Sequence, residues 1–477
     1  MYKVWFQYIF SVSICLLALS CSVPKIAEVT NNKPLPESYN DPNADSTNMA
    51  SLQWRKFFTD TNLVKLIDTA LKNNQELNIT LQEIEIAKNE ILSRKGAMLP
   101  NVNLHAGAGF EKVGLYTSQG AGDASADITP GKRVPELLPD YSAGLYAHWE
   151  VDIWKKLRNA KKAAVTRYLS TIEGRNFVLT NLIAEIASTY YELVALDNQL
   201  DIVRQNIELQ KNVLEIVKVQ KEAMRATELA VQKFQAEVLG SQSLEYDIIQ
   251  KIKEAENTIN LLLGHYPQNI PRDKNNFTAL LPQAVQAGIP SQLLANRPDI
   301  RQAELDMAAA KLDVQVAHAE FYPSFDITSS IGLQAFNPSY LVKFPESLLY
   351  SLAGDIAAPL INRSAIKAEF KNASSRQVQA LYNYQRTVLN AYLEVANQLS
   401  KINNLANSYD LKLKQVAALT KAIDISNDLF KSAHADYLEV LMTQRDALEA
   451  RLDLIDTKKE QLNAVVNVYR DLGGGWK

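Results

Sequence analysis

The chain has 477 residues, of which 47% are hydrophobic and 22% are charged, and its formal net charge is −3 at pH 7. This composition argues against a disordered or collagen-like protein and gives no basic surface for nucleic acid. Gly and Pro number only 17 each, so long helices meet few breakers. The two cysteines are Cys15 and Cys21, which excludes a disulfide framework and thiolate metal sites in the remaining chain.

The first twenty residues predict a targeting segment. Lys3 supplies a positive charge, and residues 9–19 form an apolar run that is too short to span a bilayer. The run ends at Ser20-Cys21, which resembles a bacterial lipoprotein processing site that would leave Cys21 acylated, for example with palmitate. An ordinary secretory signal with an incidental Cys is the alternative, and under either hypothesis the protein leaves the cytoplasm. The later sequence has no apolar stretch long enough for a transmembrane helix.

Alternating polarity predicts two β-hairpins, at about 101–152 and 324–360. Each first strand follows a proline, Pro100 or Pro323, and period two after a helix-ending Pro is typical of a strand. The apolar row of the first strand consists of Val102, Leu104, Ala106, Ala108 and Phe110. The row on its opposite face consists of Asn103, His105, Gly107 and Gly109. In the third strand the polar row is Asp326, Thr328, Ser330 and Gly332.

A seven-residue apolar repeat predicts a long coiled-coil helical pair after each hairpin. In the first pair the repeat runs through Ile186, Leu193, Leu200, Ile207 and Leu214, with Leu196, Val203 and Val217 three positions later. In the second it runs through Val388, Val395, Ile402, Tyr409, Val416, Ile423 and Phe430. At the rise of an α-helix, residues 155–221 would span roughly 100 Å, which is too long for one compact globule.

The order helix, hairpin, long helix, turn and returning helix occurs twice, which indicates an internal duplication. We therefore expect these segments: signal peptide 1–20, lipid-anchored leader 21–53, first repeat 54–265, Pro-rich connector 266–290, second repeat 291–472, and tail 473–477. The Gly473-Gly474-Gly475 run predicts that the tail is flexible.

Four amphipathic strands cannot close a membrane barrel, because lipid leaves no partner for open edges and small barrels begin at about eight strands. Three identical chains would supply twelve strands around a polar lumen. The periodicity alone leaves open a soluble sandwich, or a hairpin that caps a coiled coil.

Several stretches, in order and spacing, resemble the outer-membrane efflux family typified by TolC, in its lipoprotein branch. They are 54–60 with Leu63 and Leu66, 141–144, 149–154 with Arg158, 293–300 with Ala303-Glu304, 319–323 with Gly332, 359–363, 394–396, and 437–441 with Gln444-Arg445. The resemblance covers residues 22–472.

This resemblance implies an α+β, mainly α fold: long antiparallel coiled-coil helices plus two β-hairpins, assembled as a homotrimer. Its twelve-stranded barrel in outer-membrane lipid would be continued by a periplasmic α-barrel. The implied function is that of a passive duct, without cofactor or catalytic site, which exports small molecules from a periplasmic adaptor and an inner-membrane pump. A type I protein-secretion duct remains an alternative within the family, and a coiled-coil lipoprotein tether without a pore is an alternative outside it.

The motif Arg297-Pro298-Asp299 has a structural interpretation. Proline suits the first helical turn, and an aspartate there complements the helix dipole. No HExxH, GxSxG, Walker A or dinucleotide-binding signature is present, and the five histidines show no metal-ligand spacing. The sequence therefore predicts neither an enzyme nor a metal protein.

The family's tunnel narrows at its periplasmic tip, where acidic side chains line the pore. By this resemblance Glu439 is the pore-constriction residue, although a solvated coiled-coil face is the alternative for it. The two helix turns are the expected adaptor contacts, with Met224 and Ala433 at places where relatives commonly carry Gly. The tip residues are Met224, Arg225, Thr227, Ala433 and Asp436.

Overall fold

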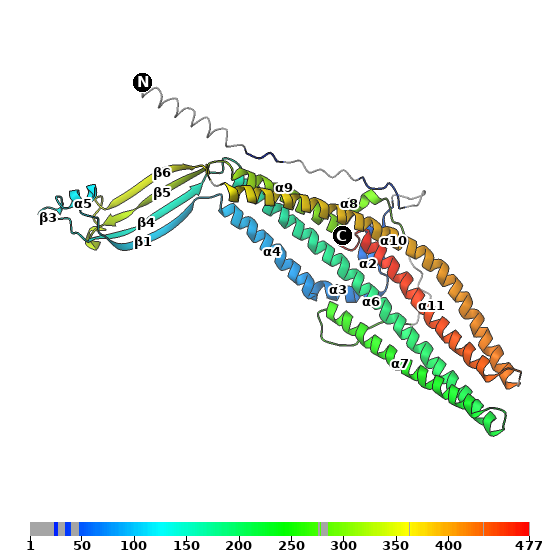
Figure 1. The fold of residues 1–477 in the computed structure, drawn as a ribbon. Helices are drawn as coiled ribbons and strands as arrows, with labels where there is room; N and C mark the ends of the chain where they lie inside the picture. Colours follow the sequence, from blue (N-terminus) through cyan, green and yellow to red (C-terminus); the bar gives the residue numbers. More distant parts are fainter. Residues whose placement is uncertain are drawn as a thin grey trace. The chain divides into compact units, whose positions relative to one another are not determined.

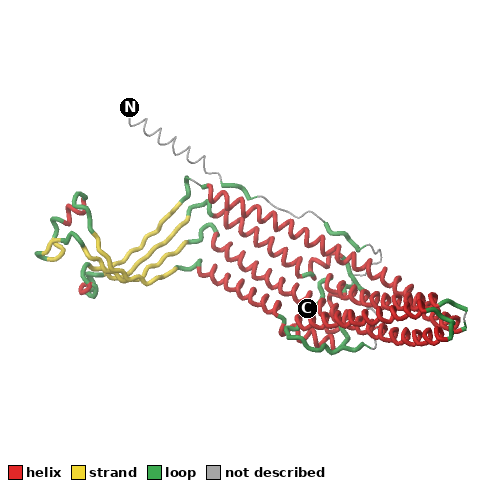
Figure 2. Tube along the Cα trace, turned by 60° about the horizontal axis from the view of Figure 1, so that its bottom comes forward, coloured by secondary structure: helices red, strands yellow, loops and turns green. Residues whose placement is uncertain are grey.

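The computed structural model describes residues 23–26, 34–39, 47–274, 277, 285–361, 363–432 and 434–476. Long helices dominate these residues, and the strands lie side by side in a sheet (Figures 1 and 2). The predicted fold class, mainly helical with two β-hairpins, is confirmed. Among the described residues, the helices include none that is both long enough and apolar enough to cross a membrane.

The chain divides into two compact units, and the long helices pass from one into the other. The first unit comprises residues 1–30, 85–168 and 305–381, and the second comprises 31–84, 169–304 and 382–477. The α-helices are α2 (Trp54–Phe57), α3 (Thr61–Asn73), α4 (Gln75–Gly96), α5 (Ser118–Asp123), α6 (Lys156–Glu222), α7 (Glu228–Leu262), α8 (Leu293–Asn296), α9 (Pro298–Ala319), α10 (Ser364–Lys431) and α11 (Tyr437–Asp471). Short 3₁₀ helices are η1 (Met49–Ser51), η3 (Pro290–Gln292) and η4 (Pro338–Tyr340).

The sheet of the first unit has four antiparallel strands in the order β1-β4-β5-β6. Their bounds are β1 (Asn101–Glu111), β4 (Leu138–Glu150), β5 (Ser324–Ala335) and β6 (Leu348–Ala357). The two hairpins thus join through β4 and β5, so that β1 and β6 are the outer strands. This joining was not predicted, because alternation within a strand says nothing about its neighbour across the hairpins.

The loop between β1 and β4 contains more structure than its Gly and Pro content predicts. It holds α5 and a small antiparallel hairpin of β2 (Asp127–Thr129) and β3 (Lys132–Arg133). The Thr117 hydroxyl caps α5 by accepting from the Gly120 amide at 3.1 Å. Gly120 is required there, because a Cβ would lie 2.2 Å from the Gly114 carbonyl oxygen.

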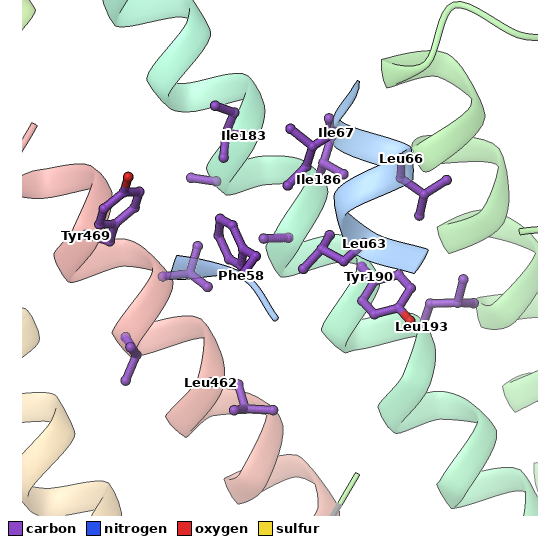
Figure 3. Packing of buried hydrophobic residues seen from close by; sticks show 14 of the residues in the cluster. Phe58, Leu63, Leu66, Ile67, Ile183, Ile186, Tyr190, Leu193, Leu462 and Tyr469 are labelled. Carbon is purple, nitrogen blue, oxygen red and sulfur yellow. The ribbon is translucent and has the colours of Figure 1, made fainter. Parts of the chain in front are cut away.

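The core of the second unit is built around α6. The predicted heptad residues Ile186, Leu193 and Val203 are fully buried, as coiled-coil packing requires. Figure 3 shows side chains of α3 and α11, including Leu63, Ile67 and Leu462, in one cluster with Ile186 and Leu193 of α6. Burial of this apolar surface is the main stabilising term for the unit.

The C-terminal tail differs from the prediction of a flexible segment. Residues Gly473, Gly474 and Gly475 are buried, and the Trp476 indole Nε1 donates to the Asn296 carbonyl at 3.1 Å. A Cβ on Gly473 would lie 2.5 Å from that same carbonyl oxygen, and Gly473 and Gly475 have positive φ of 86° and 102°. The glycines therefore serve close packing and a left-handed backbone, two uses that composition cannot tell from flexibility.

Candidate functional site

One face of the four-stranded sheet carries an apolar row that crosses all four strands. Leu104 pairs with Leu145, Leu145 with Ile331, and Ile331 with Tyr350. These side chains are between 47% and 78% exposed in the single chain. The three apolar clusters of the described residues contain no strand residue, so the described part of the chain does not bury this face in its core.

The opposite face carries the polar rows. Asn103 lies opposite Tyr146, Tyr146 opposite Ser330, and Ser330 opposite Ser351, whose hydroxyls hydrogen-bond at 2.7 Å. Gly144 and Gly332 approach so closely that a Cβ on either would lie 2.7 Å from the other's Cα. The period-two pattern therefore separates an apolar face from a polar, partly glycine-lined face.

An acidic row lies on the same polar face. Glu150 is opposite Asp326, and Asp326 is opposite Asp355. Lys156 Nζ lies 2.5 Å from the Glu150 carboxylate, and His148 Nε2 lies 3.6 Å from that of Asp326. The sequence indicated Asp326 as one member of a polar row, but only the register brings the three acids together.

Hydrogen bonds to the Asp152 carboxylate hold the turn that follows β4. Asp152 accepts hydrogen bonds from the Leu157 and Arg158 amides at 3.0 and 2.9 Å and from Arg158 Nε at 2.9 Å. Burial disfavours the charged form of Asp152 and would raise its pKa. The hydrogen bonds outweigh this effect, so the pKa of Asp152 is lowered. Trp154 stacks on Tyr322 with ring centroids 4.7 Å apart, so an aromatic pair lies at the base of the strands.

Cys21 lies outside the described residues, but Val23 and Pro24 of the leader make defined contacts. Val23 packs against a small apolar cluster that contains Phe321 and Phe370, and His318 Nε2 lies 3.1 Å from the Pro24 carbonyl oxygen. The His318 ring also contacts Tyr322 edge-on, with centroids 5.6 Å apart. His318 therefore connects the leader to the aromatic pair at the base of the strands.

Met224 holds the turn between α6 and α7 in a conformation that glycine usually supplies. Its φ is 58°, its amide donates to the Lys221 carbonyl, and the Arg225 amide donates to the Gln220 carbonyl at 2.8 Å. This pair of bonds is a Schellman motif. The Thr227 hydroxyl caps α7 by accepting from the Ala230 amide at 3.2 Å. The turn geometry thus survives without glycine, and the Met224 side chain is 95% exposed.

The second turn, between α10 and α11, repeats part of this geometry. The His434 amide donates to the Leu429 carbonyl at 2.8 Å, and Asp436 stands at the N-cap of α11 without a side-chain cap bond. Glu439 is exposed in the first turn of α11. Ala433 lies outside the described residues. The predicted tip residues that the structure describes therefore all lie at or beside helix ends.

The Arg297 motif forms a buried ionic network. Pro298 is the first residue of α9, and the Arg297 guanidinium forks onto Asp299 at 2.9 and 2.7 Å. It also donates to Glu394 at 2.7 Å and to the Asp471 carbonyl at 2.9 Å. Burial opposes its charge, but Asp299 and Glu394 outweigh burial and raise the pKa of Arg297.

The sequence did not predict that Glu394 and Asp471 join this network. Glu394 is 97 residues away from Arg297 and Asp471 is 174 residues away, and no local spacing links them. Burial raises the pKa of the Asp471 carboxyl despite the charge of Arg470. The network ties the start of α9 to α10 and to the end of α11, which is a structural use of the motif.

Known proteins resemble this chain over most of its length. The family model described as outer membrane efflux protein matches residues 66–265 and 289–474. The chain belongs to the outer membrane efflux protein family. It is 28% identical over 469 residues to the pyoverdine export outer membrane protein OpmQ of Pseudomonas aeruginosa, covering 98% of this chain and 96% of the relative. It is 27% identical to the cation efflux system protein CusC of Escherichia coli, covering 90% of each.

The fold agrees with this family. A crystal structure of CusC superposes with a TM-score of 0.82 at 24% identity, covering 95% of this chain and 99% of that one. The outer membrane efflux proteins are export proteins rather than enzymes, and the outer membrane is their location. Within the described residues, no group of three or more His, Cys, Asp or Glu side chains is arranged to hold a metal ion.

Proposed function

We propose that three copies of this chain form a passive outer-membrane duct that receives small molecules from a periplasmic adaptor and an inner-membrane pump. The observation that carries the proposal is the four-stranded sheet: one face exposes an apolar row across all strands, and both outer strands have one open edge. Lipid can surround the apolar face, but it offers no hydrogen-bond partners to the backbone groups at the two open edges.

Closure by identical copies satisfies these edges. When β1 of one chain pairs with β6 of the next, three chains give a ring of twelve strands, above the minimum of about eight for a membrane barrel. The polar face with Asn103, Tyr146 and Ser330 then lines the lumen. The exposed apolar residues of α10, including Leu389, Leu411 and Leu413, favour packing against neighbouring copies in the same assembly.

A pair of adjacent residues tests the proposed faces. Leu104→Arg places a charge on the lipid side, at a cost of about 2–4 kcal/mol per chain at mid-membrane depth, and we expect loss of assembled protein. Asn103→Arg, one position away, places the same charge toward the lumen, and we expect normal assembly with altered conductance. Light scattering in detergent measures the mass. A stable wild-type monomer, or equal tolerance of both substitutions, contradicts the proposal.

We place the acyl anchor at Cys21. Val23 packs against the cluster with Phe321 and Phe370, and His318 contacts both Pro24 and Tyr322 of the aromatic pair; aromatic residues favour membrane interfaces. A single acyl chain binds membranes only marginally, so the barrel or further chains must share the anchoring. Mass spectrometry of the mature N-terminus tests this: an unmodified Cys21, or cleavage elsewhere, rules it out.

We propose that the turns with Met224, Arg225 and Thr227, and with Ala433 and Asp436, contact the adaptor. The pump supplies the energy, so the duct needs no cofactor. Site-specific photo-crosslinking from Arg225 should capture an adaptor, whereas the same crosslinker at exposed Glu83 on α4 should not.

We propose that Glu439 forms the acidic constriction. Its exposed position in the first turn of α11 allows three copies to place three carboxylates around a narrow pore, which attracts cations. Glu439→Gln keeps the shape and should reduce cation selectivity in planar bilayers. Glu449→Gln, an exposed acid further along α11, is the matched control. Unchanged selectivity and conductance in the Glu439 variant would place the constriction elsewhere.

A further inference from the structure

The heptad repeat of α6 contains one polar residue at a core position. Val203 and Val217 occupy equivalent positions one heptad before and after Gln210, and both are fully buried. Gln210 is also fully buried. Its amide nitrogen and its amide oxygen both lack a hydrogen-bond partner among the described residues. A polar residue at such a position lowers the stability of a coiled coil.

The apolar packing divides at this level. The large core cluster ends along α6 at Ile207, and a separate cluster begins at Val213. This tip cluster contains Val217, Phe234 and Leu441 and therefore joins the ends of both helical pairs. Asn206, one turn before Gln210, is also buried, and its amide nitrogen has no partner among the described residues. Gln210 thus lies between two packed bodies.

Helix α7 contains residues that favour bending opposite Gln210. The ion pairs Arg204–Glu245 and Lys221–Glu228 join α6 to α7 on either side of Gln210. Counting inward equally along the two antiparallel helices from either pair places Gln210 opposite Leu239. The next residues are Gly240 and Ser241, and glycine and serine within a helix favour bending. A Cβ on Gly240 would meet no atom within 4 Å, so the glycine is not required for packing.

We propose that Gln210 and Gly240 form a hinge in the α6–α7 pair, about which the tip cluster moves as one body. Gln210 is buried completely within a single chain, so a neighbouring copy cannot reach its amide. In the second pair, residues 396–422 of α10, all of them described, include no buried side chain, whereas α11 buries residues such as Leu448 and Ile455. Opening of the duct by this hinge rests on the proposed function, whereas the hinge itself does not.

Hydrogen exchange of the full-length protein in detergent tests the hinge. Backbone amides at 206–214 and 237–244 should exchange faster than those around Val203. Gln210→Leu removes the unpaired amide and should slow exchange there by about tenfold. Gly240→Ala should slow it by about fivefold, because alanine disfavours local unfolding of a helix. Gln205→Leu, on the exposed side of α6, is the matched control and should leave exchange unchanged.

Two results overturn the hinge: protection at 206–214 equal to that around Val203, or unchanged exchange in the substituted proteins. If the Gln210→Leu protein fails to assemble, the exchange of the Gly240→Ala protein tests the hinge by itself. This substitution should not disturb packing, because the added Cβ enters open space. Planar-bilayer recording of the same proteins separates the two proposals. Slower exchange with a reduced open fraction supports both, and slower exchange in a protein that forms no channel supports the hinge and contradicts the proposed function.

Discussion

Helices α6 and α10 share a seven-residue repeat and nearly the same length, but they bury this repeat differently. In α6, Ile186, Leu193 and Val203 are all fully buried. In α10, Ile402, Tyr409 and Val416 hold the same repeat but are only partly buried. The repeat of α6 thus lies in the core, whereas the repeat in the middle of α10 is only partly covered, although its partner α11 buries Leu454 and Ile455.

Polar and charged groups occupy the middle of the second pair. Lys458 of α11 is 2% exposed, and its ammonium lies 5.1 Å from the centre of the Tyr409 ring. The Gln461 amide donates to the Leu405 carbonyl at 3.1 Å. A buried ammonium beside one ring is poorly compensated. The comparison teaches that a heptad repeat predicts the face of a helix, while the residues opposite it decide how tightly that face packs.

The largest difference between the pairs should appear on truncation of a core side chain. Phe234→Ala, at a fully buried position of α7, should lower the free energy of unfolding by about 3–5 kcal/mol. Val416→Ala, in the partly buried repeat of α10, should lower it by about 1 kcal/mol. Denaturant unfolding followed by circular dichroism measures both, and equal losses would break the comparison.

Replacing the buried lysine should act in the opposite direction. Lys458→Met removes an ammonium that burial leaves poorly compensated, and we expect the free energy of unfolding to rise by about 1–4 kcal/mol. Lys459→Met, at the next and less buried position, is the control and should change stability by less. A destabilised Lys458 variant would mean that its contact with Tyr409 outweighs the cost of burial.

The free energy of unfolding of the wild-type protein should depend on pH through the same lysine. Burial lowers the pKa of Lys458, so between its folded pKa and the ordinary lysine value of about 10.4 the unfolded chain binds more protons. Stability contributed by this group therefore rises with pH through that window and is lost as the pH falls. The difference between wild type and Lys458→Met, measured from pH 7 to 10, should shrink toward the alkaline end. A constant difference contradicts this prediction.

The smallest effects should come from the surface ion pairs that join the helices of each pair. Arg204–Glu245 joins α6 to α7, and Lys412–Asp453 joins α10 to α11. Arg204→Ala and Lys412→Ala should each cost about 0.2–1 kcal/mol, and less at high salt. Larger losses in one pair would show that surface charge, rather than core packing, separates the two regions.

The periodic part of the fold was predictable from the sequence. Alternation after Pro100 and Pro323 placed the strands, and the heptads placed α6 and α10, because side-chain direction follows directly from backbone geometry. The pairing of β4 with β5 and the acidic row of Glu150, Asp326 and Asp355 depend on register between distant segments, which no local pattern encodes.

The candidate site was predictable only where a residue acts through its own helix or turn. Pro298 at the start of α9 and Thr227 at the cap of α7 follow from local preferences. The Arg297 bonds to Glu394 and Asp471 arise from tertiary packing. Gln210 was not predicted, because a heptad repeat is recognised by its apolar residues. Gln210 is the polar exception at a core position of that repeat.

The core of the second unit is closed by two segments that lie far apart in the sequence. Phe57 stacks on Tyr469 with ring centroids 4.1 Å apart, and the Tyr469 hydroxyl donates to the Leu52 carbonyl, 417 residues away in sequence. Contacts of such long range form late, because a long loop must close before they contribute. A chain that still lacks its C-terminal residues is thus missing one wall of this core. Its apolar helices stay exposed until the last turn of α11 is in place, and such exposed surface favours aggregation.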